Sequence, residues 1–283
     1  MELRCRGRVL SLDRMALMGV LNVTPDSFSN GGRWLDADAA IGHAFEMIAA
    51  GADIVDVGGE STRPGAEPVP AGEEMARVLP VVDALHEASD VLISIDTRKS
   101  VVAEAAIEAG ASIVNDTLGE DEDLRIAEIA GASGAAVVAM HSRGTPQTMT
   151  SLTAYGDLVG EVRAWLEAKA KRLVWAGVAQ DAIVLDPGFG FAKSVSQNLV
   201  LLNRLGELTG LGYPVLVGTS RKSFIGKVLD VDESHRVEGT AATVVWALLQ
   251  GARLARVHDV LEVGRAVRMT EAIAAAAAEG SDD

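Results

Sequence analysis

Polar residues end several of the short apolar runs in this chain. Asp96 ends the run LISID, Asn115 ends SIVN and Asp186 ends IVLD. Carboxylate and amide groups can accept and donate several hydrogen bonds to a flat, amide-like ring. If the runs are parallel strands of a barrel, their carboxyl ends meet at one rim, where the three side chains would converge. Helix capping is the alternative for each residue, because Asp and Asn are favoured directly before helices.

Basic residues follow two later runs. Ser220, Arg221 and Lys222 come directly after VLVGT, and Arg256 and His258 stand two residues apart in LARVHD. Side chains two apart in a strand point the same way, and a guanidinium beside an imidazole can clamp an oxyanion. Barrels of parallel strands often hold a phosphate between their last two loops. The alternative is that Arg256 and His258 pair with carboxylates of the same rim.

Two long loops, residues 22–32 and 60–71, follow the first two runs and are rich in Gly, Pro, Ser, Thr and Asp. Loops of this length at the catalytic end of a barrel usually close over a substrate. Local turn chemistry is the alternative, because the same residues form turns anywhere. Three histidines outside the rim, His43, His86 and His235, are predicted to be structural or solvated. His141 stands at the end of an apolar run and has no evident partner in the sequence.

The elements that must position these residues are eight apolar runs that alternate with helical patterns. We expect a hairpin over residues 2–12, a helix starting near Asp36, another from about Gly72 and a long one over residues 155–176. The predicted strands cover residues 16–22, 53–57, 91–95, 112–114, 135–139, 183–185, 215–217 and 254–257. This order predicts a (β/α)8 TIM barrel with a short N-terminal hairpin, as one domain over residues 1–283. An open doubly wound sheet is the competitor, and the lack of G-x-G-x-x-G after the first run weakens it.

The composition narrows the function class. A formal charge of −15 disfavours nucleic acid as a partner, because phosphate binding needs a basic surface. We expect no membrane span, because no apolar run approaches about 18 residues, and no signal peptide, because the N-terminus is charged throughout. The one cysteine fits a reducing compartment, so a cytoplasmic enzyme is expected. The sequence has no zinc-type ligand spacing, nucleophile elbow or P-loop.

The combined motifs identify a family. The segments MGVLNVTPDSFSNGG, DIVDVGGESTRPGAEPV, SIDTRKS, IVND, MHSRGTPQTM, IVLDPGFGFAKS, VLVGTSRKSFIG and RVHDV together resemble the bacterial dihydropteroate synthase family, in order and spacing. The resemblance implies condensation of 6-hydroxymethyl-7,8-dihydropterin diphosphate with 4-aminobenzoate, which gives 7,8-dihydropteroate and pyrophosphate. It also implies a homodimer, and a pocket in which sulfonamide drugs compete.

The resemblance further assigns roles to individual residues. The pterin would be bound by Asp96, Asn115, Met140, Asp186, Lys222 and Arg256, and the diphosphate by Asn22, Arg63, Arg256 and His258. The aminobenzoate pocket would comprise Phe28, Thr62, Pro64, Phe191, Lys222 and Ser223. The expected catalytic set is Asp96, Asp186, Lys222, Arg256 and His258, and the expected metal is Mg²⁺ on Asn22. In the mechanism that the resemblance implies, diphosphate leaves first and the amine then attacks the cationic methylene, with no covalent enzyme intermediate.

Two other functions remain open on the sequence. A pterin-binding methyltransferase domain would share the barrel and the Asp and Asn contacts to the pterin. It would not need the diphosphate clamp that Arg256, His258 and the 220–222 turn indicate. A noncatalytic pterin-binding paralogue would keep the fold without the activity, because a fold alone does not establish a function.

Overall fold

The computed structural model describes residues 1–24, 33–63, 65–117 and 124–279. Within these residues the parallel strands are β3 (Ala16–Asn22), β4 (Ile54–Gly58), β5 (Leu92–Thr97), β6 (Ile113–Asp116), β7 (Ala136–Met140), β8 (Ile183–Asp186), β9 (Leu216–Val217) and β10 (Leu254–Val257). Their hydrogen-bonded order is β8-β7-β6-β5-β4-β3-β10-β9. Leu185 of β8 forms a parallel bridge with Val215, directly before β9. The sheet therefore closes into the predicted barrel, and the open doubly wound alternative is wrong.

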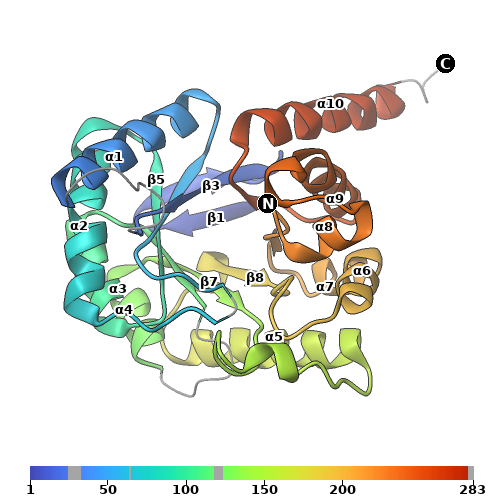
Figure 1. Ribbon diagram of the computed structural model, residues 1–283, viewed down its shortest axis with the longest axis horizontal. Helices are drawn as coiled ribbons and strands as arrows, with labels where there is room; N and C mark the ends of the chain where they lie inside the picture. Colours follow the sequence, from blue (N-terminus) through green and yellow to red (C-terminus); the bar gives the residue numbers. More distant parts are fainter. Residues whose placement is uncertain (25–32, 64, 118–123, 280–283) are drawn as a thin grey trace.

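Helices surround the strands (Figure 1). The described helices are α1 (Arg33–Ala49), α2 (Ala71–Ala88), α3 (Ser100–Ala109), α4 (Arg125–Ser133), α5 (Leu158–Trp175), α6 (Val195–Asn203), α7 (Gly206–Thr209), α8 (Ser223–Leu229), α9 (Val237–Leu249) and α10 (Val260–Glu279), with short 3-10 turns η1 (Met149–Ser151), η2 (Gln180–Ala182) and η3 (Glu233–His235). Glycines at positive φ end several helices before the next strand, for example Gly110 at φ 124° after α3. No described helix combines the length and the apolar character needed to cross a membrane.

The sequence predicts most strand bounds closely. The first and last parallel strands have the predicted bounds, and the others differ by one or two residues. β5 and β6 continue past their predicted ends because Asp96 pairs in register with Asn115, and Thr97 with Asp116. The first helix begins at Arg33, a few residues before its expected start near Asp36.

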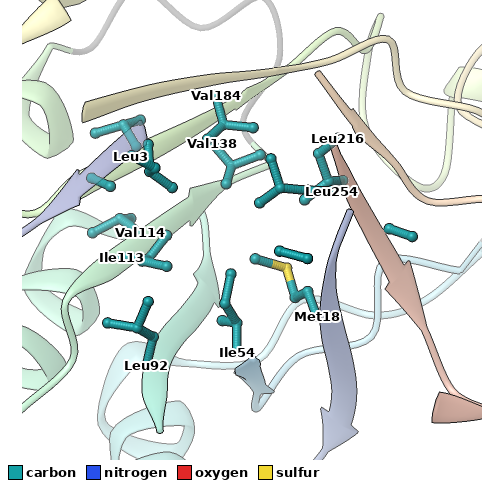
Figure 2. Packing of buried hydrophobic residues seen from close by; sticks show 14 of the residues in the cluster. Leu3, Met18, Ile54, Leu92, Ile113, Val114, Val138, Val184, Leu216 and Leu254 are labelled. Atoms are coloured by element: carbon teal, nitrogen blue, oxygen red, sulfur yellow. The ribbon is translucent and has the colours of Figure 1, made fainter. Parts of the chain in front are cut away.

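Apolar side chains fill the middle of the barrel. Met18, Ile54, Val138, Val184 and Leu254 come from five strands, are fully buried and gather at its centre (Figure 2). Every residue of β4 and β5 is buried, because the helices cover the outside of a parallel sheet while its inside packs on itself.

An antiparallel hairpin, β1 (Glu2–Cys5) and β2 (Arg8–Ser11), covers the amino-terminal end of the barrel, as predicted. Its Arg6 N–H donates to the carbonyl of Gly134, just before β7, at 2.7 Å. Arg8 Nη1 donates to the carbonyl of Val91, just before β5, at 3.1 Å. The hairpin leaves the opposite rim, at the carboxyl ends of the strands, for the polar residues.

Candidate active site

Arg256 joins side chains from three other strands inside the barrel rim. Its Nε donates to Asp56 Oδ2 at 2.6 Å and its Nη2 donates to Asp96 Oδ2 at 2.7 Å. Asn115 Nδ2 donates to the same Asp56 oxygen at 3.1 Å. Asp96 and Asn115, two of the three residues predicted to converge at the rim, thus lie in one hydrogen-bonded cluster with Arg256. Arg256 also pairs with two carboxylates of this cluster, as the alternative interpretation of that residue predicts.

Helix capping does not explain these polar residues. The residue before α3 is Lys99, with no side-chain cap, and the same is true of Leu124 before α4. Before α6, Ser194 forms a capping box with Gln197. Asp186 accepts a hydrogen bond from Gly188 N–H at 2.7 Å, which fixes the turn after β8 and not a helix.

The cluster is buried, and burial shifts the pKa of its carboxyl groups. Burial raises the pKa of Asp96 to about 7; Arg256 opposes this shift and the charge of Asp56 adds to it. Burial also raises the pKa of Asp186, against the hydrogen bond from Gly188. Burial works against the charge on Arg256, but Asp56 and Asp96 outweigh it and raise its pKa. The Asp96 carboxyl group can therefore exchange protons and hydrogen bonds with a nitrogen heterocycle near neutral pH.

Asp186 and Lys222 lie on the other side of Arg256. A side-chain carbon built on Gly218 would lie 4.0 Å from both Asp186 Oδ2 and Arg256 Cβ, so the two residues flank this glycine. Burial, followed by the nearby charge of Arg256, lowers the pKa of Lys222 to about 8. Its Nζ lies 4.0 Å from the centre of the Phe191 ring, a cation–π contact.

His258 is a neutral hydrogen-bonding group. Ser220 Oγ accepts from the His258 backbone N–H at 3.1 Å and lies 3.0 Å from its Nδ1. If the serine hydroxyl donates to Nδ1, the ring proton lies on Nε2. Burial, together with Arg256 and Arg221, lowers the pKa of His258 to about 3. The predicted oxyanion clamp therefore combines the Arg256 guanidinium with an uncharged imidazole.

Other predicted residues belong to elements that neighbour this cluster. Asn22 Oδ1 lies 3.8 Å from the position of a side-chain carbon on Gly58, and Asp96 Cγ lies at the same distance from it. Met140 is buried and pairs in register with Asp186. Ser223 is exposed at the start of α8, and Thr62 is half-buried in the loop after β4. Phe28 and Pro64 lie outside the described residues.

Arg63 is directed away from the buried cluster. Its side chain is exposed and donates to Glu233 of η3 at 2.8 Å. The loop that carries it is nevertheless held in place, because Gly65 N–H donates to the Pro146 carbonyl at 3.0 Å. Arg63 is thus at the rim, on a loop that contacts two neighbouring loops.

Buried ion pairs anchor the base of the same loop. Glu60 pairs with Arg98 and Lys99, and its Oε2 accepts from Val69 N–H at 3.3 Å. Lys99 also pairs with Glu74, which is fully buried. The ends of the 60–70 segment are therefore tied to the loop after β5.

Asp56, Lys193 and the Glu60 ion pairs are not among the site residues predicted from the sequence. Asp56 stands inside the apolar run DIVDVG. A carboxylate in the middle of a buried strand is the sequence feature that could have indicated its place in the site. Lys193 donates to His141 Nδ1 at 3.1 Å, which supplies the partner that His141 lacks in the sequence. Sequence spacing gives no sign of this contact, because it joins two loops 52 residues apart.

The residues at the rim could bind an oxygen-seeking cation only together with oxygen atoms of a bound ligand. The described residues contain no group of three or more His, Cys, Asp or Glu side chains that could hold a metal ion. Asn22 offers a hard amide oxygen near the rim. Mg²⁺ is commonly bound by one or two protein oxygens plus phosphate and water, so Asn22 fits this ion when a diphosphate is present.

Comparison with known proteins places the chain in a family. The pterin binding enzyme family matches residues 18–258. The dihydropteroate synthase of Synechocystis is 48% identical over 261 residues, which cover 92% of this chain and 90% of the relative. The Escherichia coli K12 enzyme of the same name is 46% identical over 272 residues, 96% of each chain.

Solved structures agree with the sequence relatives. A Yersinia pestis dihydropteroate synthase in complex with a sulfonamide drug matches with a TM-score of 0.91 and 44% identity, over 97% of this chain and 100% of that one. A Xanthomonas albilineans dihydropteroate synthase with 4-aminobenzoic acid matches with a TM-score of 0.91 and 40% identity, over 97% and 98% of the two chains. The Clostridium difficile enzyme with pteroic acid matches with a TM-score of 0.87 and 46% identity, over 92% and 97%. This chain therefore belongs to the pterin binding enzymes and, among them, to the dihydropteroate synthases, which are transferases of folate biosynthesis.

Proposed function

We propose that this chain condenses 6-hydroxymethyl-7,8-dihydropterin diphosphate with 4-aminobenzoate to give 7,8-dihydropteroate and pyrophosphate. The observation that carries the proposal is the Arg256 cluster. One guanidinium is held between Asp56 and Asp96, beside Asp186 and close to His258. The cluster combines acceptors for a nitrogen heterocycle with donors for a phosphate, in a chain whose solved relatives bind 4-aminobenzoic acid or pteroic acid.

The pterin would lie in the buried part of the rim. Asp96, Asn115 and Asp186 would hydrogen-bond its ring nitrogens and carbonyl, with Met140 against one edge. Lys222 would donate to a ring acceptor, and the aliphatic part of Arg256 would lie against a ring face. The carboxylates also stabilise positive charge on the pterin methylene when the diphosphate leaves.

The diphosphate would be bound on the loop side of Arg256. The Arg256 guanidinium and the neutral Nε2–H of His258 would donate to its oxygens as negative charge builds on the leaving group. Arg63 would join them by leaving Glu233, an exposed ion pair of little strength. Asn22 would hold Mg²⁺ through its amide oxygen, and the ion would supply charge neutralisation to the pyrophosphate.

The arylamine would be bound by the two long loops. Phe191, stacked under Lys222, would contact the benzoate ring together with Phe28 and Pro64. Thr62, Ser223 and Lys222 would donate to its carboxylate or flank it. Sulfonamide drugs would compete in this pocket, as the complex of the Yersinia pestis relative with such a drug indicates. The amine nitrogen attacks the methylene carbon, so no enzyme nucleophile is needed.

The proposal extends to assembly and location. Helices α6, α8 and α9 pack against one another, and all three carry exposed apolar side chains: Leu199, Val200, Val228, Leu229, Trp246 and Leu249. An apolar surface of this kind on neighbouring helices supports a homodimer, and sedimentation of a Trp246→Glu variant as a monomer would support it further. The single cysteine, Cys5, is buried, which is compatible with the proposed cytoplasmic location and a reducing compartment.

Pyrophosphate release tests the proposal. The protein is mixed with Mg²⁺ and the pterin diphosphate, with and without 4-aminobenzoate, and pyrophosphate and dihydropteroate are both measured. Release in step with dihydropteroate, and dependent on the amine, is the expected result. A methyltransferase domain would release no pyrophosphate, and a noncatalytic paralogue would bind the pterin without turnover and fail to complement a folate-requiring strain.

A further inference from the structure

Lys193 is a buried lysine to which the proposed reaction gives no role. Its Nζ donates to the Gly188 carbonyl at 3.0 Å, to the Phe191 carbonyl at 3.1 Å and to His141 Nδ1 at 3.1 Å. A protonated lysine has three N–H donors, and these acceptors match them one to one. None of the described carboxylates lies within ion-pair distance of it, although burial of an ammonium normally demands such a partner.

The acceptor at His141 is fixed in its neutral form. Burial, followed by the charge of Lys193, lowers the pKa of His141 to about 2. Its ring lies 5.2 Å from Trp165, edge to face, and 6.2 Å from Tyr155. The imidazole is therefore a fixed acceptor at the end of β7, and Lys193 joins it to the segment 187–192 that follows β8.

The segment 187–192 carries two contacts of the candidate active site. Gly188 N–H donates to Asp186 Oδ1 at 2.7 Å, and the Phe191 ring lies 4.0 Å below Lys222 Nζ. Gly188 and Gly190 have positive φ, and a side-chain carbon on Gly188 would lie 1.9 Å from the His141 carbonyl oxygen. The backbone of this segment thus runs against β7 and is fastened by Lys193 at both Gly188 and Phe191.

We propose that Lys193 is a positioning residue for the condensation. Its ammonium fastens the segment 187–192 to His141 and so holds Phe191 where the arylamine binds. This role rests on the proposed function, because Phe191 belongs to the expected aminobenzoate pocket. The neutral amine has two N–H donors for three acceptors, so deprotonation releases one of the three contacts.

The charged groups around Lys193 make this release pH-dependent. Burial lowers the pKa of Lys193 to about 7; Asp186 raises it, and Lys222 and Arg143 lower it further. The histidine that faces it, His141, stays neutral throughout this range. We therefore expect the segment 187–192 to loosen as the pH rises through neutrality.

The kinetic test compares two buried lysines. Lys193→Met keeps the length and the apolar stem of the side chain but removes its donors, and we expect the KM for 4-aminobenzoate to rise about tenfold. The KM for the pterin diphosphate should change by less than about twofold. Lys169→Met is the control, because Lys169 is equally buried but pairs with Asp116 at 3.1 Å, outside this segment. Equal arylamine KM values in Lys193→Met and the wild type would overturn the proposal.

A second measurement does not depend on turnover. Amide hydrogen exchange of the peptide that spans 187–192 should quicken about tenfold in Lys193→Met and not in Lys169→Met. In the wild type, the exchange protection of the same peptide, corrected for intrinsic rates, should fall between about pH 6 and about pH 8.5. This wild-type measurement tests the proposal even if Lys193→Met fails to fold. Exchange protection that is the same in both variants and the wild type, and at every pH, contradicts the role of Lys193. Absence of turnover in the wild type contradicts the proposed function alone.

Discussion

Arg256 Nε lies 2.6 Å from Asp56 Oδ2, in a pair that bridges β10 and β4 across the intervening strand β3. The same carboxylate oxygen accepts from Asn115, while its other oxygen, Oδ1, is buried without a hydrogen-bond partner among the described residues. Asp56 therefore orients two of the proposed pterin contacts at once. This makes it a positioning residue of the cluster, although it faces the core below the rim.

Replacement of Asp56 tests this position. Asp56→Ala removes the acceptor for both Arg256 and Asn115, so we expect kcat/KM for the pterin diphosphate to fall about 100-fold, equivalent to about 3 kcal/mol. Asp56→Asn keeps one acceptor oxygen in place and should recover most of this loss. Steady-state kinetics at saturating 4-aminobenzoate provide the measurement.

Asp53 supplies the matched control for Asp56. It lies just before β4, at the amino-terminal end of the barrel, where it pairs with Arg14 and accepts from Leu17 N–H at 2.9 Å. Asp53→Ala should lower stability and leave the kinetic constants unchanged. Equal kinetic losses in Asp53→Ala and Asp56→Ala would show a general effect on folding instead.

The raised pKa of Asp96 predicts how stability depends on pH. Its folded pKa of about 7 lies above the ordinary value of 3.8, so the folded protein holds this proton to higher pH than the unfolded chain. The resulting stabilisation is complete below the unfolded pKa and is lost as the pH rises through the folded pKa. The free energy of unfolding of the wild type should therefore fall between about pH 4 and about pH 7, relative to that of Asp96→Asn. Urea unfolding of both proteins across this range gives the difference, and parallel curves would mean that Asp96 titrates normally.

Glycine is required at position 190 for two reasons, its backbone conformation and its close approach to Lys222, and two variants can separate them. It has φ +80°, and a side-chain carbon there would lie 2.9 Å from Lys222 Cδ. Gly212 has φ +84° and no atom within 4 Å of the same position. Alanine at either site should cost about 1 kcal/mol of stability through backbone strain. Only Gly190→Ala should also displace Lys222 and lower kcat/KM, by about tenfold or more. Unchanged kinetics in Gly190→Ala would indicate that the position of Lys222 does not matter.

The sequence predicted the barrel and much of its rim because each of those signals is local. Asp96, Asn115 and Asp186 lie within the last two residues of strands whose apolar runs are visible in the chain, and a shared rim follows once the strands are parallel. The pairing of Arg256 with Asp56 joins residues 200 positions apart. It depends on how the closed sheet staggers its strands, which no local pattern encodes.

Other contacts escaped prediction for related reasons. No local pattern indicates that Lys193 is buried, because lysine is seldom buried without a carboxylate. The exposed pair of Arg63 with Glu233 joins two loops whose approach is set by the barrel as a whole. The neutral state of His258 follows from burial and from the neighbouring Arg256, and neither effect can be read from the Arg-x-His spacing.

The central claim is that Asp186 binds the pterin ring and His258 binds the diphosphate, and calorimetry with two ligands tests it most directly. The ligands are the pterin diphosphate with Mg²⁺ and the corresponding pterin alcohol, which lacks the diphosphate. Asp186→Asn should weaken binding of both ligands by about tenfold or more, because we propose that the carboxylate contacts the ring. His258→Ala should weaken binding of the diphosphate alone, by about tenfold, because we propose that the neutral imidazole contacts only the leaving group. A His258→Ala variant that binds both ligands with equally reduced affinity, or an Asp186→Asn variant that binds both as tightly as the wild type, would contradict the account.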